Sequence, residues 1–211
     1  MNPQDLPLPL VAILRGLLLA EVQPLAAALF DAGFRMLEVP LNRPGALDCI
    51  AALRAIAPAG SLVGGGTMLS VADVDNVHAA GGQLMVAPNC EPVVIRRAAE
   101  LGMFCAPGIA TPTEAFTALR SGAHALKIFP ADMVGFAGLA ALRSVLPPHT
   151  LLWPVGGITP ESLAPWRRAG ATGFGIGSQL YQPGVSAATL STRARAFVDA
   201  WHATAKGDTL V

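Results

Sequence analysis

The sequence predicts an α/β fold, a single-domain (β/α)8 TIM barrel, on two observations. Short apolar runs typical of buried strands alternate strictly with Ala- and Leu-rich segments of helical spacing. Such alternation is typical of a parallel sheet covered by helices. The unit also repeats eight times within 211 residues, which favours a closed barrel over an open sheet. No composition shift or linker divides the chain, so we expect one domain over residues 1–211.

Eight apolar runs supply the predicted strands. Strands of a parallel sheet are covered on both faces, so they read as near-continuous Val, Leu, Ile and Ala. The runs are Leu10–Leu14, Met36–Leu41, Leu62–Gly64, Gln83–Ala87, Met103–Ala106, Ala125–Phe129, Leu151–Val155 and Gly173–Ile176.

Eight segments of helical spacing lie between and after these runs. Several end at an Ala-Gly pair such as Ala32-Gly33, where glycine closes the last turn. Two begin near a Thr-Pro pair, at Thr111 and Thr159, and these residue types cap a first turn. The predicted helices are Glu21–Ala32, Gly45–Ile56, Val71–Ala80, Pro92–Leu101, Thr113–Leu119, Gly135–Leu146, Pro160–Ala169 and Ala187–Ala203.

Charge and composition limit the class of protein. The net charge is zero with no basic cluster, which argues against a nucleic acid or a membrane surface as partner. No apolar run is long enough to span a bilayer, and the N-terminus lacks a signal-peptide pattern. Cys49, Cys90 and Cys105 are odd in number and lack metal-site spacing, so we expect reduced thiols in the cytoplasm. No histidine pair has metal-ligand spacing and the acidic residues do not cluster, so no metal is expected.

Lys127 is the residue that most needs an explanation. It lies in "HALKIFPA" (124–131), inside a predicted buried strand, although charged side chains are seldom fully buried without a partner. Nearly all other cationic residues are Arg, and the second lysine is Lys206 in the C-terminal tail. Arginine cannot give up its proton, whereas a lysine amine whose pKa is lowered by burial becomes a nucleophile. The alternative is a lysine that extends from a strand end into solvent.

Glu38 is the second ionisable group set inside a predicted strand. In barrels of this kind the chemistry takes place at the C-terminal ends of the strands. Four strands apart, Glu38 and Lys127 can face each other across the barrel mouth. A lysine forms an iminium with a ketone, which accepts the electrons of an adjacent C–C bond while a carboxylate moves the protons. The alternative is a structural Glu38–Lys127 ion pair.

Glycines follow the last two strands. Gly156-Gly157 and Gly177-Ser178 offer backbone N–H groups and a hydroxyl in the loops that commonly bind phosphate in these barrels. Arg15, after the first strand, can hold a second anion such as a carboxylate. Thr67, after three glycines, can donate to the same group. Arg43 is the alternative residue for this anion, but it is expected to face solvent.

The chain resembles the class I 2-keto-3-deoxy-6-phosphoaldonate aldolases in "LVAILRG", "LEVPLN", "VGGGTM", "VAPN", "PGIATPTEAF", "ALKIFPA", "PVGGITPE" and "GIGSQLY". The resemblance covers essentially the whole chain. It implies a homotrimer of barrels that needs no cofactor and cleaves a sugar acid phosphate to pyruvate and D-glyceraldehyde 3-phosphate. It further implies Lys127 as the Schiff-base lysine, Glu38 as the acid and base, and two binding sites. These are a carboxylate site with Arg15 and Thr67, and a phosphate site with Gly156, Gly157, Gly177 and Ser178.

Two sister groups of this family act on substrates that are epimers at C4. The group acting on the gluconate epimer typically has "LR" where this chain has Leu41-Asn42 and "PTGG" where it has "PVGG", so the resemblance favours the galactonate epimer. Val155 lies near the expected scissile bond and cannot hydrogen-bond the C4 hydroxyl as a threonine would. The gluconate substrate is the alternative within the family. A phosphosugar isomerase or epimerase would share the phosphate loops and use Glu38 as a base, with Lys127 as an electrostatic partner. A non-enzymatic binder of a phosphate ligand is a third alternative, but it would not need a buried pair of Lys127 and Glu38.

Overall fold

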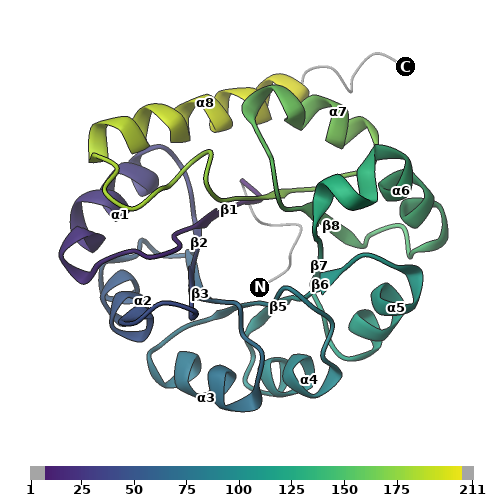
Figure 1. The fold of residues 1–211 in the computed structure, drawn as a ribbon, viewed down its shortest axis with the longest axis horizontal. Coiled ribbons are helices and arrows are strands. Elements are labelled where there is room, and N and C mark those ends of the chain that lie inside the picture. The colour runs from purple at the N-terminus through teal and green to yellow at the C-terminus, as the bar shows by residue number, and fades with distance from the viewer. Residues whose placement is uncertain (1–7, 206–211) are drawn as a thin grey trace.

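The computed structural model describes residues 8–205 and has the predicted TIM-barrel architecture, an inner ring of strands surrounded by helices (Figure 1). The strands are β1 (Leu10–Ile13), β2 (Met36–Pro40), β3 (Leu62–Gly66), β4 (Leu84–Val86), β5 (Phe104–Ala106), β6 (Gly108–Ile109), β7 (Ala125–Ile128), β8 (Leu151–Pro154) and β9 (Phe174–Ile176). The helices are α1 (Val22–Asp31), α2 (Ala46–Ile56), α3 (Val71–Ala79), α4 (Pro92–Glu100), α5 (Pro112–Arg120), α6 (Ala131–Val145), α7 (Leu163–Arg168) and α8 (Ala187–Ala205). Two 3-10 turns, η2 (Leu19–Glu21) and η3 (Pro160–Ser162), precede α1 and α7.

The strands form a closed ring. One parallel sheet has the order β5-β4-β3-β2-β1-β9 and a second has the order β6-β7-β8. An isolated parallel bridge between Val155 and Gly175 joins β8 to β9. On the other side of the second sheet, the N–H of Lys127 donates to the carbonyl of Pro107 at 2.9 Å, which ties β7 to the segment between β5 and β6.

The fifth predicted strand is longer than expected and is interrupted. We predicted Met103–Ala106, and the structure continues past Pro107 into β6, where Gly108 pairs with Lys127. Proline has no N–H to give to a ladder, so the pairing breaks at that residue. The segments β5 and β6 are therefore two parts of one barrel strand.

Two predicted helices also differ from those observed. Helix α6 begins at Ala131, four residues before the predicted start, and contains a break at Gly135 with φ 66° and ψ 174°. Glycine adopts this conformation readily because it has no Cβ. The predicted helix Pro160–Ala169 is divided into η3 and α7. Within residues 8–205, no helix is both long and apolar enough to cross a membrane.

Strand alternation decides which side chains enter the barrel. Successive residues of a strand point to opposite faces. On β2, Leu37 and Val39 belong to the large core between strands and helices, whereas Met36 belongs to a smaller cluster inside the ring. Glu38, two residues beyond Met36, therefore also points inward.

The smaller cluster fills the N-terminal half of the barrel interior. It contains Met36, Leu62, Leu84, Phe104 and Trp153, and the rings of Phe104 and Trp153 stack with centroids 5.4 Å apart. Met36, Leu62, Leu84 and Phe104 each begin a strand, whereas Trp153 lies opposite Lys127 in the pairing of β8 with β7. Glu38 and Lys127 occupy the second inward positions of β2 and β7, nearer the C-terminal ends of the strands.

Candidate active site

Lys127 and Glu38 both lie inside the barrel and border the same cavity. Each is the third residue of its strand, β7 and β2 respectively, and they are 7% and 2% exposed. Both border a small cavity, here called the inner cavity, whose walls also include Ile13, Trp153, Val155 and Gly175. The two ionisable residues predicted to face each other across the barrel are thus brought together.

A small space separates the two groups. Lys127 and Glu38, both within the described chain, form no ion pair within 4.0 Å, and the buried Oε2 of Glu38 has no hydrogen-bond partner. The inner cavity measures about 10 Å³, close to the roughly 10–15 Å³ that one water needs. A direct structural ion pair is therefore not what holds Lys127 in the interior.

Burial changes the ionisation of both groups. The pKa of Lys127 is lowered by desolvation, with Glu38 acting in the opposite direction and the positive charge of Arg15 adding to the lowering. The pKa of Glu38 is raised by desolvation, against the opposing effects of Lys127 and Arg15. Both shifts favour the uncharged forms, an amine with a free electron pair and a carboxyl that holds a proton.

Glycines on β3 make room for Glu38 and for the backbone of the neighbouring strand β4. A Cβ at Gly66 would lie 2.8 Å from the Glu38 carboxylate oxygens, and a Cβ at Gly64 would overlap the backbone carbonyl of Leu84 on β4. Thr67 follows with φ 56°, a region that β-branched residues rarely adopt. Strained backbone of this kind clusters at functional sites. Thr67 is thus placed next to the residue that abuts Glu38, although it does not border the inner cavity itself.

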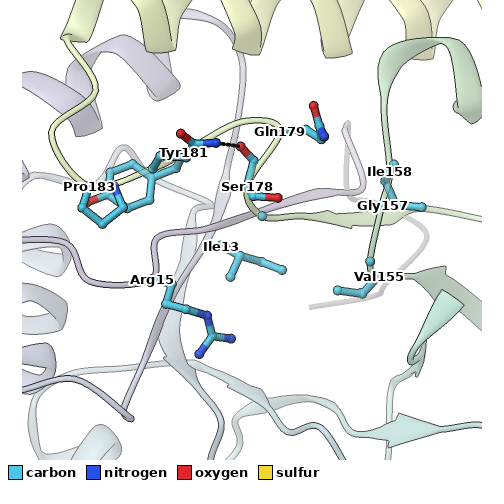
Figure 2. A pocket seen from close by; sticks show the side chains of 12 residues that line it. Ile13, Arg15, Val155, Gly157, Ile158, Ser178, Gln179, Tyr181 and Pro183 are labelled. Atoms are coloured by element: carbon cyan, nitrogen blue, oxygen red, sulfur yellow. Dashed lines mark hydrogen bonds between the residues drawn. The ribbon is translucent and has the colours of Figure 1, made fainter. Parts of the chain in front are cut away.

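The residues predicted to bind phosphate line a single pocket. This pocket, here called the loop pocket, measures about 270 Å³, and its lining includes Val155, Gly156, Gly157, Gly177, Ser178 and Arg15. Gly156 and Gly157 have φ of 113° and 65°, which favour glycine. Figure 2 shows Ser178 and Gln179 on one side of the pocket and Gly157 on the other. Exposed N–H groups and a hydroxyl in such loops make an anion site.

Val155 and Ile13 connect the two cavities, because they border both of them. Val155 is fixed at both ends: its N–H donates to Ile128 and its carbonyl accepts from Ala131, each at 3.0 Å. A Cβ at Gly175 would lie 2.6 Å from Val155 Cγ2, so glycine leaves room for this side chain. A substrate that reaches from Lys127 to the loop pocket must pass Val155.

Arg15 borders the loop pocket, but its guanidinium points towards Asn42. Its side chain is exposed, and its guanidinium points away from Ser178 in Figure 2. Its Nη1 donates to Oδ1 of Asn42 at 2.8 Å. This arrangement fits an anion other than the phosphate. Arg43, expected to face solvent, is exposed and borders a different pocket.

Several residues of the loop pocket were not predicted. Gln179, Tyr181 and Gln182 follow β9, and the amide of Gln182 donates to the Ser178 carbonyl at 3.1 Å. Polar residues after a strand are ordinary loop composition, so only the three-dimensional arrangement assigns them. Among residues 8–205 there is no group of three or more His, Cys, Asp or Glu that could hold a metal ion.

Known proteins similar to this chain fall into one family. The aldolase family described as "KDPG and KHG aldolase" matches residues 6–192. The chain belongs to this family. The resemblance predicted from the sequence motifs is therefore confirmed, and family membership favours an aldolase over an isomerase, an epimerase or a non-enzymatic binder.

Curated members of the KDPG and KHG aldolase family differ in how well they match. The chain is 46% identical to the 2-dehydro-3-deoxy-6-phosphogalactonate aldolase of Escherichia coli strain K12, over 92% of this chain and 95% of the relative. It is 45% identical to the probable enzyme of the same name from Rhizobium meliloti, over 92% of each. The 2-dehydro-3-deoxy-phosphogluconate aldolase of Treponema pallidum is 37% identical over 68% of each chain.

Solved structures of family members have the same fold. A structure described as "Native KDPGal structure" superposes with a TM-score of 0.92 at 45% identity, covering 95% of this chain and 97% of the other. A porous protein cage designed by fusing symmetric oligomeric domains contains a similar chain. It superposes with a TM-score of 0.93 at 45% identity, covering 96% of this chain and 75% of that one.

The two β3 glycines give a matched pair of tests for this aldolase site. Gly66→Ala pushes against the end of the Glu38 side chain, so we expect cleavage to slow by on the order of 10²-fold with little loss of stability. Gly64→Ala pushes against backbone, so we expect a loss of about 1–3 kcal/mol or more in the free energy of unfolding. Thermal unfolding and kcat measure both effects. Full activity in Gly66→Ala, or equal destabilisation by the two changes, would contradict this assignment.

Proposed function

We propose that this protein is a class I aldolase that reversibly cleaves 2-dehydro-3-deoxy-6-phosphogalactonate to pyruvate and D-glyceraldehyde 3-phosphate. The observation that carries the proposal is Lys127, a buried amine of lowered pKa that shares the inner cavity with Glu38. The choice of the galactonate substrate rests on the relatives, because two with this name match over 92% of the chain and the gluconate-type relative over 68%.

The chemistry begins at Lys127. Its neutral amine adds to the C2 ketone, and the Glu38 carboxyl gives its proton to the carbinolamine hydroxyl, which leaves as water and gives an iminium. Glu38, directly or through a water of the size that the inner cavity admits, removes the proton of the C4 hydroxyl. The electrons of the C3–C4 bond then move into the iminium, and D-glyceraldehyde 3-phosphate leaves as the aldehyde. Glu38 returns a proton to C3 of the enamine, and water hydrolyses the iminium to release pyruvate and the free amine.

The other site residues bind the two ends of the substrate. Backbone N–H groups of Gly156, Gly157 and Gly177, with the Ser178 hydroxyl, receive the phosphate in the loop pocket. Arg15 and Thr67 receive the carboxylate. The iminium on Lys127 is itself the electron sink, so the reaction requires no cofactor.

Val155 is assigned to the choice of epimer. It lies between the inner cavity and the loop pocket, where a bound substrate would place the bond to be broken. Valine and threonine have nearly the same shape, but valine cannot hydrogen-bond the C4 hydroxyl. A valine site therefore accepts the galactonate form and discriminates only weakly against the gluconate form.

We further propose that the protein assembles as a homotrimer. A similar chain serves as one of the fused symmetric oligomeric domains of a designed cage, which supports self-association. Large apolar side chains are exposed on three consecutive helices: Val93 on α4, Phe116 on α5, and Met133 and Phe136 on α6. We assign this surface to the contact between copies.

Two broader expectations remain proposals. The three cysteines are free thiols, which supports a cytoplasmic location, because reduced cysteines are usual there. The second expectation is that residues 1–211 form one barrel domain.

Lys127→Arg tests the imine directly. Arginine keeps the charge but cannot act as the nucleophile, so we expect cleavage to be abolished. Borohydride added with pyruvate should give a reduced adduct by intact-mass analysis in the parent and none in this variant. Lys206→Arg, the same change at the other lysine, is the control and should be trapped like the parent. Appreciable turnover by Lys127→Arg would rule out the mechanism.

Val155→Thr tests the epimer assignment. One added hydrogen bond should shift preference towards the gluconate epimer by about 0.5–1.5 kcal/mol, which is only several-fold. The measurement is kcat/KM for both epimers with the parent and the variant. If the ratio of the two kcat/KM values is unchanged in the variant, Val155 does not determine the epimer preference. A parent that strongly prefers the gluconate epimer would refute the galactonate assignment.

The oligomeric state is tested by light scattering. We expect the parent to have three times the mass of the 21.7 kDa chain. Met133→Glu places a charge on the surface assigned to the contact and should yield monomers. Val145→Glu makes the same change at the other end of α6, where Val145 is 56% exposed, and should leave the trimer intact. A monomeric parent would contradict the proposal.

A further inference from the structure

Arg15 and Asn42 lie in the loops that follow two neighbouring strands. Each lies two residues beyond its strand, β1 ending at Ile13 and β2 at Pro40. These strands pair in parallel with Ile13 opposite Glu38, so their following loops lie side by side at the catalytic end of the barrel. The bond from Arg15 Nη1 to Asn42 Oδ1 is 2.8 Å long and joins two exposed side chains.

The partner of Arg15 is a neutral amide rather than a carboxylate. Within the described chain, Arg15 forms no ion pair within 4.0 Å. An amide oxygen fixes one N–H of the guanidinium but leaves its charge uncompensated. A guanidinium has five N–H donors in a rigid fork, so the remaining donors stay available for a bidentate contact with a carboxylate.

The charge of Arg15 reaches the reacting groups. It lowers the pKa of Lys127 and opposes the rise in the pKa of Glu38. Arg15 also borders the loop pocket together with Val155, the residue that leads into the inner cavity. A carboxylate held by Arg15 would therefore be attached to a ketone close to Lys127.

We propose that Asn42 is a positioning residue that holds the Arg15 guanidinium in place for the substrate carboxylate without neutralising its charge. This inference rests on the proposed function, because it assumes that a 2-keto acid binds at Lys127. It assigns a specific job to Asn42 and explains why the side chain there is an amide. An aspartate would fix the guanidinium equally well but would compete with the substrate for it.

The first test is a double-mutant cycle. Asn42→Leu removes the hydrogen bond and should raise KM about tenfold or more with little change in kcat, because carboxylate binding is the same in the ground and transition states. In an Arg15→Met background, Asn42→Leu should have almost no further effect. An equal effect in both backgrounds would overturn the proposal, because Asn42 would then act on the substrate or the fold independently of Arg15.

The second test separates positioning from charge. Asn42→Asp retains an acceptor oxygen for Arg15 but adds a negative charge, so we expect KM to rise at least as much as in Asn42→Leu. Asn76→Asp makes the same change on exposed α3, away from the inner cavity and the loop pocket, and should behave like the parent. If Asn42→Asp has the KM of Asn76→Asp, the proposal fails.

Trapping with borohydride and saturating pyruvate distinguishes this failure from failure of the proposed function. The parent and all Asn42 and Arg15 variants keep Lys127, so each should still give the adduct. No adduct in the parent would overturn the imine mechanism and the inference with it. Adducts in every protein, with Asn42 variants that match the parent in KM, would overturn the inference alone.

Discussion

The site depends on keeping the Lys127 amine out of water. A buried ammonium is costly, and a direct ion pair would lessen that cost but would also keep the amine protonated. The barrel avoids this outcome with an apolar cluster below Lys127 and with Glu38 held beyond ion-pair distance. Desolvation is the leading cause of both pKa shifts, so burial favours the uncharged forms of Lys127 and Glu38 together, as the proposed nucleophile and proton carrier require.

The composition of the proposed anion sites follows from the same constraint. A cation packed directly against the inner cavity would lower the pKa of Lys127 further but would hold Glu38 in its charged form. Most of the loop pocket is instead lined by uncharged groups, among them Gly156, Gly157 and Gly177, which bring backbone dipoles rather than full charges. Arg15 borders the loop pocket but not the inner cavity, and its exposed position lets water screen part of its effect on Lys127 and Glu38. In the proposed phosphate site, backbone N–H groups thus take the place that charged side chains have in many other anion sites, with Arg15 at the border of the pocket.

The periodic pattern of apolar residues was sufficient to predict the strands, the helices and the barrel fold. Alternating apolar runs predicted the strand carrying Lys127, and the rarity of lysine marked that residue as unusual. The periodic pattern could not predict the interruption of the fifth strand at Pro107 or the helical turn before Gly135. Both depend on single residues and local backbone angles. The hydrogen bond between Arg15 and Asn42 could not be predicted either, because it depends on the register of β1 and β2, which brings the two following loops together.

The same site explains where stability and function conflict. Two buried ionisable groups that form no ion pair weaken a fold, and apolar residues of similar volume would often make it more stable. Thr67 adds a strained backbone, and Gly64 and Gly66 give up side-chain packing at the same strand end. These departures lie in the barrel interior, while a large cluster of buried hydrophobic side chains fills the space between strands and helices. The packing between strands and helices therefore stabilises the barrel, and the inward positions at the C-terminal ends of the strands can carry polar residues needed for function.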